Sequence, residues 1–154
     1  MNWDPEALLA DFLSVARLAG AGLARESIDI EILRKPHRPP TRLPPGKMAV
    51  YVFSDDERVL KVGKVGPRSQ ARYTSQHYRV GSAPSTLAAS ILKDAALLER
   101  HQLDEASVSD WIKNNTHRVN FIIDSDCGVP ALTLLEAFLQ CRLSPTFEGF
   151  SSQR

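Results

Sequence analysis

The chain has 154 residues, of which 43% are hydrophobic and 24% are charged, and 19 basic against 18 acidic side chains leave a net charge of +1. This length suits one domain that buries a core without disulfide or metal staples. The composition excludes disordered, collagen-like and low-complexity classes. Charged residues interrupt every apolar stretch before it reaches the roughly 20 residues of a membrane span, and the start lacks the basic region of a signal peptide. We therefore expect a cytoplasmic protein with no membrane partner.

The charge balance hides a strong segregation along the chain. Between Arg34 and Lys93 there are 12 Lys/Arg and three acidic residues, a net +9, while the rest of the chain holds 7 basic and 15 acidic residues, a net −8. Segregation of this kind is typical of a surface that faces a polyanion. The alternative is that the basic and acidic segments neutralise each other across the fold, and the charge pattern alone favours neither.

The N-terminal part is expected to hold a helix followed by an extended segment. Asp4 suits an N-cap, Pro5 suits the first helical position, and the apolar residues that follow recur at helical spacing. We therefore predict a helix at 4–24 within an N-terminal helical extension, residues 1–33. Residues 34–47 hold five of the ten prolines and five Lys/Arg, so they predict a stiff basic strap. The strap is either a plain linker or a basic arm that lies along a phosphate backbone.

The remaining residues, 48–150, are expected to form one α+β domain. Its predicted elements in chain order are strands at 48–53 and 58–65, helices at 69–79 and 85–98, a short helix around Trp111, a strand at 117–124 and a helix at 130–143. Together they predict a small antiparallel sheet of three or more strands, flanked by helices.

The first two strands surround Asp55-Asp56-Glu57 and predict a β-hairpin. With a three-residue loop, Tyr51 and Lys61 would be direct cross-strand neighbours on one face of the sheet. A lysine beside a tyrosine hydroxyl favours the phenolate.

The final predicted helix is apolar nearly all round and therefore buried, but it contains Glu136. A carboxylate in such a helix is costly unless it is ion-paired, hydrogen-bonded or bound to a metal. Glu136 is therefore a candidate metal ligand, and a partner such as Arg118 or Arg142 is the structural alternative.

These residues follow the order and spacing of a known pattern, and the stretch from 46 to 148 resembles the GIY-YIG nuclease superfamily. Its first motif would be Ala49-Val50-Tyr51, which keeps the family Tyr, and its second Lys61-Val62-Gly63, which keeps the Gly. Lys61 stands where most members have Tyr, as in some restriction endonucleases of the superfamily. Arg72 matches the catalytic Arg of the family, and Glu136 matches its metal-binding Glu.

Two departures from the family pattern concern supporting groups. Glu148 stands where the family has Asn shortly after a Pro, which here is Pro145. The family often has a His one helical turn after the Arg, but Gln76 holds that place here. His77 or Tyr73 would then serve as the auxiliary group.

The resemblance implies a metal-dependent endonuclease that hydrolyses phosphodiester bonds of DNA, with RNA left open. Tyr51 would orient or deprotonate the attacking water with help from Lys61, and Arg72 would hold the negative charge of the phosphate. Glu136 would bind Mg²⁺ or Mn²⁺. The expected catalytic set is Tyr51, Lys61, Arg72, His77 and Glu136, and the expected nucleic-acid contacts are Lys64, Arg68, Arg72 and Arg79.

Target choice in such nucleases usually comes from an added domain or partner, for which this chain has little room. We therefore expect weak sequence preference, a homo-oligomer or a protein partner. The alternative function is a catalytically inactive module of the same fold that binds nucleic acid or protein. A third reading, a structural protein with internally neutralised charge, leaves the acid-free stretch 58–93 unexplained.

Overall fold

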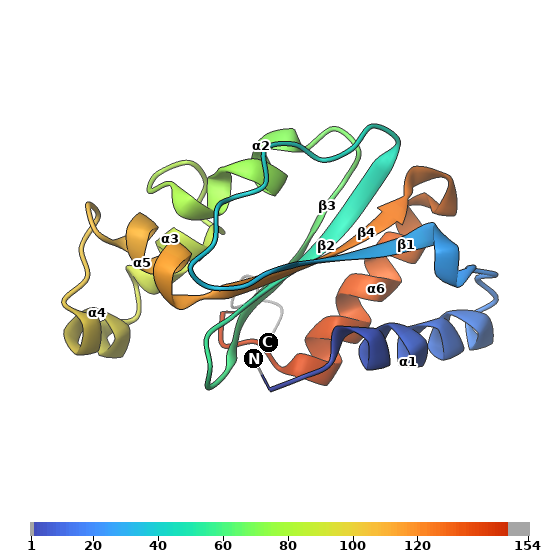
Figure 1. The fold of residues 1–154 in the computed structure, drawn as a ribbon, viewed down its shortest axis with the longest axis horizontal. Helices are drawn as coiled ribbons and strands as arrows, with labels where there is room; N and C mark the ends of the chain where they lie inside the picture. The colour runs from blue at the N-terminus through green and yellow to red at the C-terminus, as the bar shows by residue number, and fades with distance from the viewer. Residues whose placement is uncertain (1, 148–154) are drawn as a thin grey trace.

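The computed structural model describes residues 2–147 as an α+β fold around one four-stranded antiparallel sheet, with strand order β1-β4-β2-β3 (Figure 1). The strands are β1 (Ile28–Leu33), β2 (Lys47–Ser54), β3 (Val59–Val65) and β4 (His117–Asp124). The fold class predicted from the sequence is confirmed. β2 and β4 are central, so the predicted catalytic Tyr51 lies inside the sheet, whereas β3 forms one of its two edges.

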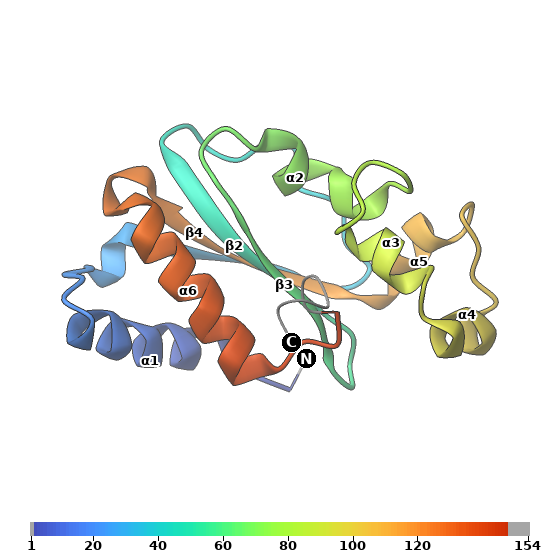
Figure 2. The ribbon, with the colours of Figure 1, turned by 180° about the vertical axis from the view of Figure 1, so that it is seen from behind.

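The sheet separates two layers of helices, which Figure 2 shows from behind. One layer consists of α1 (Pro5–Leu18) and α6 (Gly128–Leu143), and the other contains α2 (Gln70–Thr74), α3 (Leu87–Ile91), α4 (Ala95–His101) and α5 (Val108–Asn115). Short 3-10 turns complete the chain at η1 (Arg25–Ser27), η2 (Gln76–Tyr78) and η3 (Ser125–Cys127). Within residues 2–147, no helix has the length and apolarity needed to cross a bilayer.

Successive side chains of a strand point to opposite faces of the sheet, so they pack in two separate hydrophobic cores. On β2, Val50 and Val52 pack in the core of α1 and α6, whereas Tyr51 and Phe53 pack in the core of α2, α3 and α5. Because both faces are covered, β2 is buried at every position from Met48 to Ser54. The sheet therefore separates the two cores, with Tyr51 on the face that α2 covers and α6 on the opposite face.

The N-terminal helix is confirmed but is shorter than predicted. The Asp4 carboxylate accepts a hydrogen bond from the backbone N–H of Glu6, as an N-cap does, and α1 ends at Leu18. Gly20 follows with a φ of +79°, a conformation that favours glycine and stops the helix.

β1 was not predicted, although it lies inside the expected N-terminal helical extension. Its isoleucines alternate with the acids Asp29 and Glu31, and it pairs antiparallel with β4 along its whole length. The N-terminal residues therefore supply an edge strand of the same sheet as well as a helix.

Two predicted helices are each interrupted. The helix predicted at 69–79 breaks at Ser75 into α2 and η2, and the one predicted at 85–98 is replaced by α3 and α4. Side-chain caps explain the second break, because Asp94 accepts from the Leu97 N–H and starts a new helix. Thr86 caps α3, so this helix begins two residues after the predicted start. The strand at 117–124 is confirmed, and α6 begins two residues before the predicted start.

The predicted register of the hairpin was wrong. Tyr51 pairs with Gly63, and Lys61 pairs with Phe53. The carboxylate of Asp55 accepts the backbone N–H groups of Glu57 and Arg58, both at 2.8 Å, and so holds a longer loop than the three residues expected. A β-bulge between Phe53 and Ser54 shifts the register further, because Phe53 pairs with Lys61 whereas Ser54 pairs with Val59. Tyr51 and Lys61 therefore share a face but are not direct neighbours.

Candidate active site

The hydroxyl of Tyr51 reaches the β3 edge of the sheet across a glycine. Tyr51 has an exposed fraction of 0%, and its ring lies over Gly63 so closely that a Cβ built on Gly63 would be 2.2 Å from the hydroxyl oxygen. Real Cβ atoms do not approach other atoms this closely, so a side chain at position 63 would force the ring to move. The presence of glycine at position 63 is therefore explained by the ring of Tyr51.

Arg72 of α2 meets the same hydroxyl. Its Nε and Nη2 both lie 3.4 Å from the Tyr51 hydroxyl oxygen, which accepts these two long hydrogen bonds. Burial raises the pKa of the Tyr51 phenol, and the charge and hydrogen bonds of Arg72 oppose that rise. The guanidinium is half-buried, so it retains capacity to contact a phosphate while it holds the hydroxyl.

Lys61 occupies a different place from the one predicted. Its side chain is buried, with a relative exposure of 5%, and its Nζ donates to the backbone carbonyl of Phe147 at 3.3 Å. Burial, helped by the positive charge of Arg72, lowers its pKa to about 8. The expectation that Lys61 sits directly beside the Tyr51 hydroxyl is thus corrected, and Arg72 is the cation in contact with that hydroxyl.

His77, on η2, packs against the ring of Tyr51. The two ring centroids are 4.3 Å apart, and the Nδ1 of His77 accepts the backbone N–H of Leu87 at 3.2 Å. Burial, with Arg118 and Arg72 nearby, lowers the pKa of His77 well below its usual range, so the ring is neutral with its proton on Nε2. That Nε2 is buried and has no hydrogen-bond partner among residues 2–147.

Glu136 approaches from the opposite layer. It projects from α6, and its carboxylate pairs with the Nζ of Lys64 at 2.6 Å, with side-chain exposures of 17% for Glu136 and 37% for Lys64. Lys64, predicted to contact nucleic acid, is thus an ion-pair partner of the predicted metal ligand. The charge of Glu136 also raises the pKa of Tyr51, so the two groups interact electrostatically across the sheet edge without a direct contact.

A metal ion at this site would have Glu136 as its main protein ligand. No group of three or more His, Cys, Asp or Glu suited to a metal occurs in the described part of the chain. A single half-buried carboxylate that already attracts an ammonium group fits Mg²⁺ or Mn²⁺, since Mg²⁺ keeps several waters and binds through one or two carboxylates.

The other predicted nucleic-acid residues lie around α2. Arg68 precedes the helix and Arg79 follows η2, and both side chains are exposed. Neither forms an ion pair within residues 2–147. With Arg72 between them in sequence, they give this side of the molecule positive charge that the fold does not neutralise.

Arg118 is a buried cation that the sequence analysis did not place in the site. It is the largest fully buried side chain, and its guanidinium donates to Asn120 Oδ1 at 2.8 Å and to the Tyr73 carbonyl at 2.7 Å. Its Cζ lies 5.8 Å from the ring centroid of Tyr51 and 5.2 Å from that of Phe53. Its charge also opposes the rise in the Tyr51 pKa. The only sequence signal was that Arg118 alternates with apolar residues, which normally indicates a solvent-facing position.

Glu148, the departure from the family Asn, lies outside the described residues. No protein-family model, curated protein or solved structure matches the chain. The structure brings Arg72 and His77 each into contact with Tyr51, places Lys61 on the same face of the sheet, and sets Glu136 across the sheet edge.

Proposed function

We propose that this protein is a metal-dependent endonuclease of the GIY-YIG type that hydrolyses phosphodiester bonds of DNA. The observation that carries the proposal is the contact of the Arg72 guanidinium with the Tyr51 hydroxyl. This contact lies at the β3 edge of the sheet, where Gly63 has no side chain. A phenol beside a guanidinium fork is suited to a reaction in which water attacks a negatively charged phosphorus centre.

In the proposed reaction, Tyr51 orients the attacking water and, as the phenolate, takes its proton. The water oxygen forms a bond to phosphorus while the bond to the leaving oxygen breaks. Arg72 favours the phenolate before attack and binds the phosphate oxygens as negative charge develops. Glu136 would hold Mg²⁺ or Mn²⁺, and the bound ion would supply positive charge near the leaving oxygen.

The neighbouring groups have supporting roles in this proposal. His77 packs against the tyrosine ring at an interplanar angle of 57° and limits its rotation, so it is a positioning residue. Lys61 contributes positive charge below a pH of about 8, where its amine is protonated. Arg118 places a second, permanent positive charge behind the ring of Tyr51.

A catalytically inactive nucleic-acid-binding or protein-interaction module is the second candidate. The ion pair between Lys64 and Glu136 favours it, because the ammonium group already neutralises the carboxylate that a metal would need. Retention of Arg72 against Tyr51 favours the enzyme, since an inactive module has no need for a buried phenol held by a guanidinium. In either case we propose a cytoplasmic protein whose target choice comes from self-association or a partner.

The deciding experiment is cleavage of plasmid DNA and of RNA with Mg²⁺ or Mn²⁺. Wild type is compared with Tyr51→Phe and Glu136→Gln, and Tyr78→Phe serves as a control that removes a buried hydroxyl elsewhere in the same core. We expect cleavage by wild type and the control, and a loss of about 10²–10⁴-fold for Tyr51→Phe. Absence of wild-type cleavage on both nucleic acids, or unchanged cleavage by the two site variants, would contradict the enzyme.

A further inference from the structure

The strap, residues 34–47, is fastened to the domain along its length. The strap follows the end of β1 and passes α5 and α2, and its last residue, Lys47, is the first residue of β2 (Figure 1). A plain linker between strands needs no side-chain anchors, so the contacts of the strap show whether it is only a connection.

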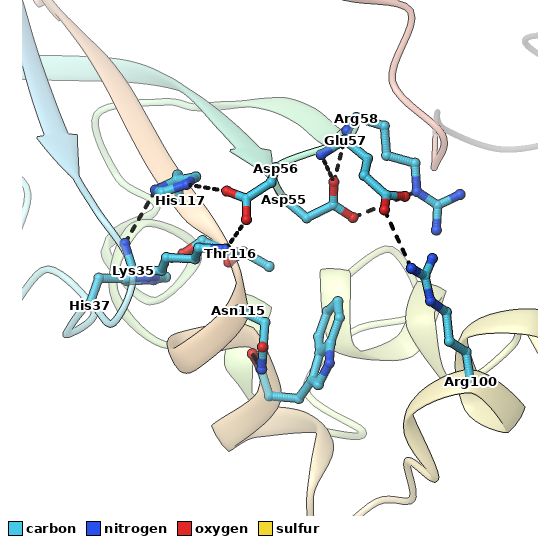
Figure 3. Close-up of polar contacts among 11 residues, drawn as sticks. Lys35, His37, Asp55, Asp56, Glu57, Arg58, Arg100, Asn115, Thr116 and His117 are labelled. Carbon is cyan, nitrogen blue, oxygen red and sulfur yellow. Dashed lines mark hydrogen bonds and ion pairs between the residues drawn. The ribbon is translucent and has the colours of Figure 1, made fainter. Parts of the chain in front are cut away.

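The strap is anchored near its start to the first residue of β4 and to the loop between β2 and β3. The backbone N–H of Lys35 donates to His117 Nδ1 at 3.2 Å, and the Lys35 ammonium pairs with the Asp56 carboxylate. The same carboxylate meets His117 Nε2 at 3.1 Å, which closes the triangle seen in Figure 3. The charge of Lys35 is therefore neutralised by Asp56, and its backbone is held by His117.

His37 fixes the middle of the strap. Its backbone N–H donates to the Lys113 carbonyl, its Nδ1–H donates to the Thr116 carbonyl, and its Nε2 accepts from the Tyr78 hydroxyl, each at 2.9 Å. The imidazole is buried, and burial lowers its pKa, so it is neutral at pH 7.

The far end is clamped to the helix of the site. Leu43 has an exposed fraction of 2%, and its backbone N–H and carbonyl form two 2.9 Å hydrogen bonds with the side-chain amide of Gln70. Gln70 is the first residue of α2, which carries Arg72. The strap and the catalytic arginine are thus held on one rigid unit.

Next to these anchors the strap presents three arginines to solvent. Arg34, Arg38 and Arg42 are all exposed, and none of them has an ion-pair partner within the described residues. They recur every four residues, so neighbouring arginines are at most about 14 Å apart along the chain. Each guanidinium is thus free to take a different anionic group.

Three surface arginines outside the strap are ion-paired, unlike Arg34, Arg38 and Arg42. Arg25 pairs with Glu6 at 2.8 Å, Arg142 with Asp11 at 2.9 Å and Arg100 with Glu57 at 3.3 Å. Arg68 and Arg79, beside α2, are also exposed and unpaired within residues 2–147, so the strap extends the unpaired positive charge that lies around α2. The basic and acidic segments were expected either to face a polyanion or to neutralise each other across the fold. Among the described residues, no acidic group neutralises Arg34, Arg38 or Arg42.

We propose that the strap is a pre-ordered phosphate-binding arm that holds the nucleic-acid backbone on the α2 side of the site through Arg34, Arg38 and Arg42. This inference rests on the proposed function for its ligand, nucleic acid. A fixed arm binds phosphates without first losing chain entropy, unlike a flexible basic tail. Arginine also contacts phosphate through a planar fork, and every such contact releases counterions.

The test measures how binding to a short labelled DNA duplex depends on salt, by fluorescence anisotropy with EDTA present. The variant Arg34→Ala/Arg38→Ala/Arg42→Ala is compared with the control Arg25→Ala/Arg100→Ala/Arg142→Ala, which removes the same charge from paired arginines. We expect the slope of log K against log salt to shrink by about 2.7 in the strap variant, or about 0.9 per phosphate contact, and to stay near wild type in the control. Arg→Lys at the three strap positions should keep most of the slope.

Three results would overturn the strap inference: an unchanged slope in the strap variant, an equal loss in the control, or no binding by wild type. The strap arginines form no ion pair within residues 2–147, so the strap variant should keep the urea midpoint of wild type. The control breaks three ion pairs and the bond from Arg25 to the Ile28 carbonyl, so its urea midpoint is expected to be lower, and binding of both variants is compared under conditions where both are folded. Failure of the nuclease is separable, because the assay contains no divalent metal. If Tyr51→Phe cleaves as wild type does while the strap variant loses slope, the nuclease fails and the arm stands.

Discussion

The Tyr51 hydroxyl lies where a side chain on Gly63 would have to be. A Cβ there would be 2.2 Å from the hydroxyl oxygen and 2.6 Å from Cζ of the same ring. The tyrosine of the central strand therefore uses the bare backbone of the edge strand to reach the rim of the sheet, where Arg72 meets it. Tyr51 and Gly63 are thus sterically matched to each other.

This fit predicts that Gly63→Ala is harmful out of proportion to its size. The added methyl group must displace the ring, so we expect a loss of about 1–3 kcal/mol in the free energy of unfolding, measured with urea, and loss of any cleavage. Gly66→Ala is the matched control, because nothing lies within 4 Å of its added Cβ. Equal stability of the two variants would show that the ring moves aside at no cost.

Removal of single hydroxyl groups should separate chemistry from stability. Within residues 2–147 the hydrogen bonds of the Tyr51 hydroxyl are the two 3.4 Å bonds from Arg72, so Tyr51→Phe is expected to cost less than about 1 kcal/mol of stability. Tyr78→Phe removes the donor to His37, which lies at 2.9 Å in a buried setting, and should cost about 1–3 kcal/mol. Urea unfolding of both variants measures these losses, and the reverse order of stabilities would contradict the geometry.

Acid should destabilise the protein below a pH of about 6.5. Burial lowers the pKa values of His37 and His77 in the folded state, so the unfolded chain binds more protons between the unfolded and folded pKa values. Stability is therefore complete above about pH 6.5 and falls as the pH drops, by up to about 1.4 kcal/mol per pH unit for each histidine. Urea midpoints at several pH values measure the slope, and His77→Gln should reduce it. A flat profile from pH 7.5 to 5 would contradict the neutral, buried imidazoles.

Lys64 should compete with metal for Glu136. Its ammonium group is 2.6 Å from the carboxylate, and an ion that binds there must displace it. A partly exposed pair of this kind is worth up to about 1 kcal/mol, so Lys64→Met should tighten Mn²⁺ binding by up to about fivefold. Calorimetric titration measures the affinity, with Lys113→Met as the control, since Lys113 pairs with Asp110 on the distant α5. Weaker binding in Lys64→Met would mean that the lysine supports the ion instead.

Local patterns were sufficient for the fold class but not for the register or the burial of charge. β4 and the N-cap of α1 followed directly from alternation and from Asp4. The pairing of Tyr51 was missed because the longer loop is set by the Asp55 carboxylate and a bulge, which strand propensity does not encode. Arg118 was missed because its burial depends on distant groups, the Tyr73 carbonyl and the Tyr78 hydroxyl.

The partition of the molecule into two cores gives β3 a further role. Tyr51 and Arg72 belong to the layer of α2, whereas Glu136 belongs to the layer of α6. The distance between Tyr51, the proposed water-activating group, and Glu136, the proposed metal ligand, is thus set by the width of a single edge strand. A substitution in one helical layer can then change one of these two groups, while β3 keeps the group in the other layer in place.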